Sequence, residues 1–133
     1  MITDSYRGWV ALGGLAGLLA VAAAAGAAHL AVDASETRAV GAAVQMQGWH
    51  ALALLGCGIW GARGGRLVHV AGAAFALGMV LFCGTVYAGA LGGPHLGALA
   101  PIGGSLLMLG WLLLGLSAVR PMIRPTIRPT IRH

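Results

Sequence analysis

The chain has 133 residues, of which 59% are hydrophobic and only 8% are charged, and its formal net charge is +5. Soluble domains carry about 25% charged residues, so this composition excludes a soluble globular protein and predicts one that lies in the lipid bilayer. All the basic residues are arginines that interrupt no apolar run, which indicates membrane orientation and argues against a nucleic-acid partner.

The first apolar run extends from residue 9 to residue 30 and contains no charge. At 1.5 Å per residue, its roughly 22 residues are long enough to cross a hydrocarbon core about 30 Å thick. A cleaved signal peptide is the alternative, because residues 22–25 offer small side chains for cleavage. The run is longer than an ordinary signal-peptide core, however, and Arg7 is a weak basic flank. We therefore expect a membrane span at 9–30.

The acidic segment at residues 33–38 is expected to be a loop. Ser35 or Thr37 in this loop is able to cap a short surface helix that leads into a second span at residues 42–62.

A third span is expected at residues 67–91 and a fourth at 96–119. Glycine pairs mark the turns before them, at residues 63–66 and 92–95, and the second turn also contains a proline. Because short connections force neighbouring helices to pack side by side, the sequence predicts an all-α membrane protein of four antiparallel transmembrane helices in an up-down bundle.

The arginines are distributed unevenly between the two ends of this bundle. Seven lie on the side that holds both termini and the turn at 63–66, whereas only Arg38 lies on the other side. The positive-inside rule then predicts that both termini are cytoplasmic, in a multi-pass protein of the bacterial inner (plasma) membrane.

Small residues recur at helical spacing in the first, third and fourth spans. Close backbone approach through such residues joins helices in a membrane, where lipid tails offer no hydrophobic driving force. The stripes are expected either to pack inside the bundle or to face another subunit. The glycines chosen as packing residues are Gly13, Gly17, Gly84, Gly103 and Gly104.

Residues 121–133 form a separate element, in which Arg-Pro repeats every four residues. The prolines forbid a helix and favour an extended cytoplasmic tail. The tail is expected to contact anionic lipid or a partner protein through its arginines, which together with the one preceding it are Arg120, Arg124, Arg128 and Arg132.

Polar side chains are predicted to meet near the outer face of the bundle. Gln47 and His50 share one side of the second span through their i, i+3 spacing, and His29 and Tyr87 lie at the same level of their own spans. Pro101 is expected to free a backbone carbonyl near the start of the fourth span, for which these side chains are donors.

Three interpretations of this polar cluster remain open: a structural hydrogen-bond network, a site for a small polar or quinone-like molecule, and a metal or haem site with His29 and His50 as ligands. No carboxylate lies inside a predicted span, and no metal-binding or hydrolase motif occurs. No cofactor and no enzymatic activity are therefore predicted. Cys57 and Cys83 are expected to be apolar fillers at different depths, and His69 to lie among the lipid headgroups.

Several motifs carry a family resemblance. They lie at residues 26–29, 47–53, 77–87, 100–104 and 110–111. On these motifs the chain resembles the small four-helix inner-membrane family of unknown function that includes the bacterial YgdD proteins and a vertebrate mitochondrial relative. The resemblance extends over about residues 10–120. It departs from the family pattern at Gly26-Ala27-Ala28-His29, which is shorter than the usual Gly-Ala-Phe-Gly-Ala-His.

The resemblance implies the four-helix fold and the membrane location, and it implies no activity. It marks as signature positions His29, Gln47, His50, Tyr87 and Pro101. From the residues themselves we expect a non-catalytic accessory or assembly subunit of a larger membrane complex, such as a respiratory one, with the lipid bilayer and other integral membrane subunits as partners. The alternative is a ligand-binding membrane protein that holds a metal, haem or quinone at the polar cluster.

Overall fold

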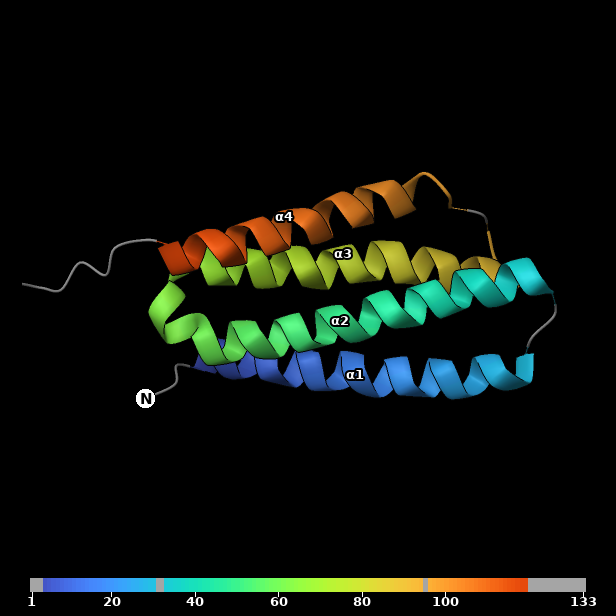
Figure 1. The fold of residues 1–133 in the computed structure, drawn as a ribbon, viewed down its shortest axis with the longest axis horizontal. Coiled ribbons are helices and arrows are strands. Elements are labelled where there is room, and N and C mark those ends of the chain that lie inside the picture. Colours follow the sequence, from blue (N-terminus) through green and yellow to red (C-terminus); the bar gives the residue numbers. More distant parts are fainter. Residues whose placement is uncertain (1–3, 31–32, 95, 120–133) are drawn as a thin grey trace, which may run out of the picture.

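The computed structural model describes residues 4–30, 33–94 and 96–119, and over these residues it contains helices and no strand. There are four helices: α1 (Asp4–Leu30), α2 (Ala34–Gly64), α3 (Arg66–Ala90) and α4 (Leu99–Val119). The predicted all-helical fold is therefore confirmed. Consecutive helices lie side by side and are joined at alternate ends of the molecule, so that α1 begins at the end where α4 finishes (Figure 1).

Three of the described helices, α1, α3 and α4, are long and apolar enough to cross a membrane. The helix α2 is longer still, with 31 residues, but it does not meet the same hydropathy requirement. Its glutamines and histidine lower the hydropathy, and it is also the helix with the most buried residues among those described. The polar side chains are thus concentrated in the helix that has the most protein around it.

The start of α2 corrects the prediction of a loop at residues 33–38. The Asp33 carboxylate accepts hydrogen bonds from the backbone N–H groups of Ser35 at 2.7 Å and Glu36 at 2.8 Å, and the helix begins at Ala34. An aspartate at this position satisfies N–H groups that have no partner within the helix. The helix cap is therefore Asp33, and neither Ser35 nor Thr37 has that role.

The turn between α2 and α3 is tighter than the four residues expected. Only Gly65 lies outside the helices, and its φ of 61° is a conformation that glycine adopts without steric cost. The fourth helix begins at Leu99, three residues later than the predicted span at 96–119.

The helices form an open array, because each packs mainly on its neighbour in the chain. The extensive contacts are those of α1 with α2, α2 with α3, and α3 with α4, and a small contact joins α2 to α4. Within the described residues α1 makes no comparable contact with α3 or α4. The most completely buried large side chains therefore come from the other three helices: Phe75, Leu54, Leu107, Val68 and Cys57.

Two of the predicted packing glycines lie at close backbone contacts. A Cβ on Gly13 would lie 2.8 Å from the Ala51 carbonyl oxygen, and one on Gly103 would lie 2.6 Å from the Phe82 backbone nitrogen. At Gly17 and Gly104 the nearest atoms would be 3.9 Å and 4.0 Å away, and at Gly84 nothing lies within 4 Å. Internal packing thus applies to the first pair of glycines and not to Gly84.

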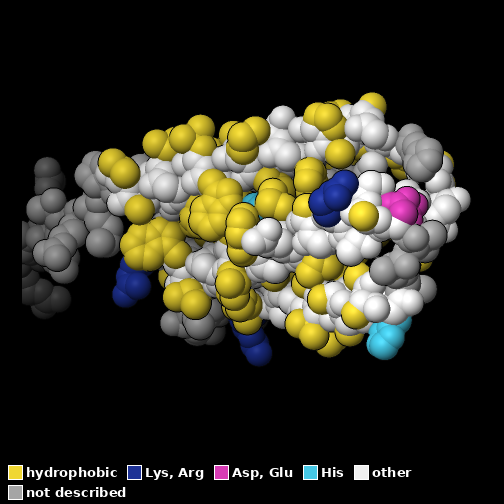
Figure 2. Space-filling model, turned by 45° about the vertical axis from the view of Figure 1, so that its right-hand side comes forward, with side chains coloured by type: hydrophobic (Ala, Val, Ile, Leu, Met, Phe, Trp, Pro, Cys, Tyr) yellow, Lys and Arg dark blue, Asp and Glu magenta, His cyan; other side chains and the backbone are white. Residues whose placement is uncertain are grey.

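Both cysteines are buried and free, so they form no disulfide with each other. Cys57 is in the apolar core, and the Cys83 thiol lies 3.4 Å from the Ala43 carbonyl oxygen of α2. The surface of the molecule is apolar along its length. Figure 2 shows hydrophobic side chains over the middle of one face, with acidic side chains toward one end.

Candidate functional site

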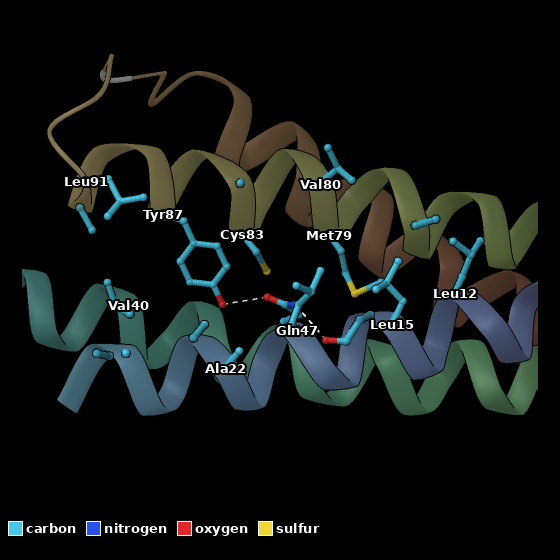
Figure 3. A pocket seen from close by; sticks show the side chains of 18 of the residues that line it. Leu12, Leu15, Ala22, Val40, Gln47, Met79, Val80, Cys83, Tyr87 and Leu91 are labelled. Carbon is cyan, nitrogen blue, oxygen red and sulfur yellow. Dashed lines mark hydrogen bonds between the residues drawn. The ribbon is translucent and has the colours of Figure 1, made fainter. Parts of the chain in front are cut away.

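Two of the predicted cluster residues, Gln47 and Tyr87, meet in the structure. The Tyr87 hydroxyl donates to the Gln47 side-chain oxygen at 2.8 Å, and the Gln47 side-chain nitrogen donates to the Ala16 carbonyl oxygen at 2.9 Å (Figure 3). This chain of two hydrogen bonds joins α1, α2 and α3. Gln47 is only 7% exposed, so the helices it connects cover most of its side chain.

His50 lies elsewhere, on the side of α2 that faces α3 and α4. One ring nitrogen, Nδ1, is 2.6 Å from the Met46 carbonyl oxygen, and the other, Nε2, is 3.1 Å from the Trp111 indole nitrogen. The indole N–H is a donor only, so Nε2 accepts and Nδ1 carries the proton. The ring also packs on Phe75, with a centroid distance of 5.6 Å. Both ring nitrogens are thus engaged: Nδ1 bonds within α2, and Nε2 joins α2 to α4.

The predicted meeting of Gln47 with His50 is therefore wrong, for a geometric reason. Three residues turn an α-helix by about 300°, which leaves the two side chains roughly 60° apart. That angle is enough to send them to different sides of α2 when neighbouring helices pack on both sides. Gln47 is directed toward α1 and α3, and His50 toward α4.

His29 and Pro101 do not join either group. His29 is exposed in the last turn of α1, where it makes none of the contacts described above. Pro101 is exposed in the first turn of α4, where a backbone N–H has no partner within the helix in any case. The expected freed carbonyl near Gly97 is therefore not produced, because the helix starts at Leu99.

His69 joins α3 to α1, although it was expected from the sequence only to lie among the lipid headgroups. Its Nδ1 accepts a hydrogen bond from the Trp9 indole at 3.1 Å, and its ring stacks on Tyr6 with centroids 4.6 Å apart. The Trp9 ring also lies over Gly72, where a Cβ would come within 2.7 Å of it. These contacts bridge α1 to α3 at the end of the molecule where both helices begin.

A groove of about 670 Å³ lies between α1 and α3, with α2 as its floor (Figure 3). It starts at Leu12 and Ala76, just beyond the Trp9–His69 bridge, and continues to Glu36 and Leu91 at the opposite end. The Tyr87–Gln47 hydrogen bond lies on its wall and floor. The other lining side chains are mainly apolar, including Leu15, Leu19, Leu54, Met79 and Val80.

The groove carries very little charge. Among the described residues that line it, Glu36 is the one ionisable carboxylate and none is an arginine. Across the described part of the chain, no group of three or more histidine, cysteine or acidic residues lies together in a way that could hold a metal ion. In that same part, every buried side-chain nitrogen or oxygen has a hydrogen-bond partner. The site is thus suited to apolar binding near one polar pair.

The sequence motifs do not indicate this groove. Small residues of α1 outside the predicted packing stripe line it, at Ala22, Ala23, Gly26 and Ala27, and Gly84, one of the predicted packing glycines, lines the facing wall of α3. A stripe of small residues indicates close approach or open space equally well, so the spacing alone does not choose between them. The predicted tail at residues 121–133, with Arg120 before it, lies outside the described residues.

Comparison with known proteins adds one finding about this chain. Residues 22–104 match the model of a family described as "Protein of unknown function (DUF423)". The matched segment contains Gln47, His50 and Tyr87, together with α2, α3 and the C-terminal part of α1. No solved structure matches the chain.

Proposed function

This chain belongs to the DUF423 family of proteins of unknown function, and we propose that it is a non-catalytic inner-membrane protein that holds one long hydrocarbon chain in the groove between α1 and α3. The observation that carries the proposal is the groove itself. It is elongated, apolar, bridged at one end by Trp9 and His69, and lined by three helices.

The proposal includes four antiparallel membrane spans with both termini in the cytoplasm of a bacterium. Three helices have the hydropathy of spans, and α2, at about 46 Å by its 31 residues, has the length. Polar side chains are tolerated inside a bilayer when other helices surround and satisfy them, as they do at Gln47 and His50. The arginine distribution supplies the orientation. The YgdD-like motifs support the assignment of this chain to the four-helix inner-membrane proteins within the family.

The dimensions of the groove suit a single hydrocarbon chain. The α1 lining from Leu12 to Ala27 covers about 22 Å at 1.5 Å per residue. With its volume of about 670 Å³, the groove is long and wide enough for one extended chain.

A substitution that fills the groove tests the proposal. A Cβ on Gly26 would meet nothing within 4 Å, so Gly26→Trp places an indole in the groove without displacing the backbone. Gly14→Trp is the matched control, because Gly14 lies on the same helix, is equally open and does not line the groove. Native mass spectrometry of the detergent-purified protein measures the lipid that each variant retains.

We expect about one chain-bearing lipid per protein in the wild type and in Gly14→Trp, and several-fold less in Gly26→Trp. The proposal is wrong if the wild type retains no such molecule, or if both tryptophan variants retain it equally.

A second candidate function is that of an accessory or assembly subunit of a larger, possibly energy-converting, membrane complex. The open array favours it, since α1 and α4 are flanking helices with mostly exposed residues. Gly14 and Gly115 on these helices are exposed, with nothing within 4 Å, which allows a further helix to approach closely. Mild-detergent extraction followed by mass spectrometry is expected to recover other integral membrane subunits, and deletion of residues 121–133 to reduce that recovery. Recovery of the protein alone would count against this role.

A further inference from the structure

We infer that the groove recognises an isoprenoid quinone, a neutral ring with carbonyl oxygens on a long apolar chain, and that Gln47 and Tyr87 are the residues that recognise its ring. The inference rests on the proposed function and adds the chemistry of the ligand. Three features of the groove lead to it: the depth of the polar pair, the spare hydrogen-bonding capacity there, and the charge of the lining.

The polar pair lies deep in the groove. Gln47 is bonded to the carbonyl of Ala16, which is 14 residues before the end of α1 at Leu30, or about 21 Å along the helix. Ala16 is also 12 residues, or about 18 Å, after the start of α1 at Asp4, so the pair lies near the middle of this helix and of a hydrocarbon core centred on it, and not near the outer face as the sequence predicted. The ester and phosphate groups of a phospholipid do not reach it, so a phospholipid would place only its tail against the pair. A ligand with a polar group inside its apolar body matches the pair better.

The pair keeps hydrogen-bonding capacity after its own contacts are made. A glutamine amide has two N–H donors, and the Gln47 nitrogen uses one of them on Ala16. The Tyr87 hydroxyl donates to Gln47, and it is free to rotate toward a ligand instead. Both residues line the groove (Figure 3). The site therefore offers donors to a ligand, and a quinone carbonyl oxygen is an acceptor of that kind.

The charge of the lining excludes ionised headgroups at this depth. The described part of the lining contains no arginine, and its one carboxylate, Glu36, lies at the outer end. Burying a phosphate or carboxylate beside Gln47 would require a counter-charge that the lining does not supply. A neutral ring meets no such cost. From the level of Ala16 to that of Ala27, about 16 Å of apolar groove continues toward the outer end, which accommodates the first part of an isoprenoid chain.

The experiment measures the quinone that the full-length protein retains after it is purified in mild detergent from phosphatidylcholine vesicles that contain a long-chain ubiquinone. Bound quinone is quantified from its reduced-minus-oxidised absorbance after free lipid is removed. Tyr87→Phe removes the hydroxyl and keeps the ring that packs beside the groove. Thr85→Val is the matched control, because the Thr85 hydroxyl is bonded within α3 to Leu81 and does not line the groove.

We expect the wild type and Thr85→Val to retain about one quinone per chain, and Tyr87→Phe to bind it about fivefold more weakly, in keeping with the loss of one hydrogen bond. Squalene, an isoprenoid hydrocarbon without a carbonyl, provides a test that needs no variant. It is expected to displace the quinone poorly from the wild type.

Equal binding by Tyr87→Phe, or displacement of the quinone by an equal amount of squalene, would overturn the recognition of the ring. Retention of phospholipid without quinone would also overturn it, while leaving the binding of a hydrocarbon chain in place. If the wild type retains neither quinone nor any other chain-bearing lipid, the inference and the proposed function both fail.

Discussion

Single polar side chains join helices at three levels of this molecule. Trp9 and His69 connect α1 to α3 at one end, Gln47 connects α2 to both of them, and His50 with Trp111 connects α2 to α4. In a bilayer, hydrogen bonds of this type contribute about 1–2 kcal/mol at most, and an unsatisfied partner is costly. These polar residues are therefore accounted for by the helix pairs that they hold together, whereas Thr85 and Ser105 bond to carbonyls of their own helices.

His50 is predicted to be a structural residue rather than a metal or haem ligand. His50→Ala removes the acceptor of the Trp111 indole and leaves a cavity beside Phe75, so we expect a loss of about 1–3 kcal/mol in the free energy of unfolding. Trp111→Phe, which removes the donor and shortens a side chain that is 50% exposed, should cost less. Reversible unfolding in mixed micelles measures both. Unchanged stability of His50→Ala, or a haem absorption band that disappears with it, would contradict this role.

Asp33 makes the start of α2 sensitive to acid. The backbone N–H of Glu36, and then the hydroxyl and backbone N–H of Ser35, stabilise its carboxylate and lower the pKa of Asp33 from the ordinary 3.8. A lowered folded-state pKa means that the cap is fully effective above pH 3.8 and is lost as the pH falls through the lower folded-state value. Amide hydrogen exchange of the first turn of α2 should accelerate over that range. Asp33→Asn should remove this pH dependence, and an unchanged profile in that variant would count against it.

At the scale of the helix, adjacent glycines have different roles. Gly103 lies against the backbone of α3, where a Cβ would be 2.9 Å from the Gly78 carbonyl oxygen, whereas the next residue, Gly104, has nothing closer than 4.0 Å. A backbone atom cannot rotate away as a side chain can, so a methyl group at the first position must separate α3 from α4. The open position has no such constraint.

We expect Gly103→Ala to lower the free energy of unfolding by about 1–3 kcal/mol, as overpacking does. Gly104→Ala should be neutral, or should gain up to about 1 kcal/mol from the higher helix propensity of alanine. Thermal unfolding in one detergent compares the two. Equal destabilisation by both substitutions would show that the close contact of Gly103 with the α3 backbone has no special role in the packing of α3 on α4.

At the scale of the whole molecule, the location of the termini depends on whether α2 crosses the membrane. An even number of crossings places both ends of the chain on one side, and an odd number places them on opposite sides. The three helices with clear hydropathy therefore do not decide the topology, and the polar helix α2 does.

We predict four crossings with both termini cytoplasmic. Alkaline phosphatase, which is active only outside the cytoplasm, should be inactive when fused after residue 119 and active when inserted at residue 93, between α3 and α4. Activity after residue 119 would indicate three crossings. In that case the polar side chains of α2 would lie in a re-entrant or interfacial helix.

The sequence alone determined the helical elements of this protein and predicted that it lies in a membrane. Apolar runs of sufficient length, broken by glycine and proline, predict the helices because helix length and chain reversal are local properties. Composition predicts a membrane protein because it, too, does not depend on which segments are in contact. A local pattern does not always distinguish a loop from the start of a helix. The acidic segment at 33–38 was expected to be a loop for this reason, although Asp33 caps a helix there.

Only the tertiary structure decided which polar residues meet and where space remains. Gln47 and His50 are three residues apart and contact different helices. The angle of about 60° between them does not show which helix each one contacts until the positions of α1, α3 and α4 are known. The groove likewise depends on α1 packing on α2 while remaining apart from α3 beyond the Trp9–His69 bridge. Contacts between helices distant in sequence produce both features, and no local pattern encodes them.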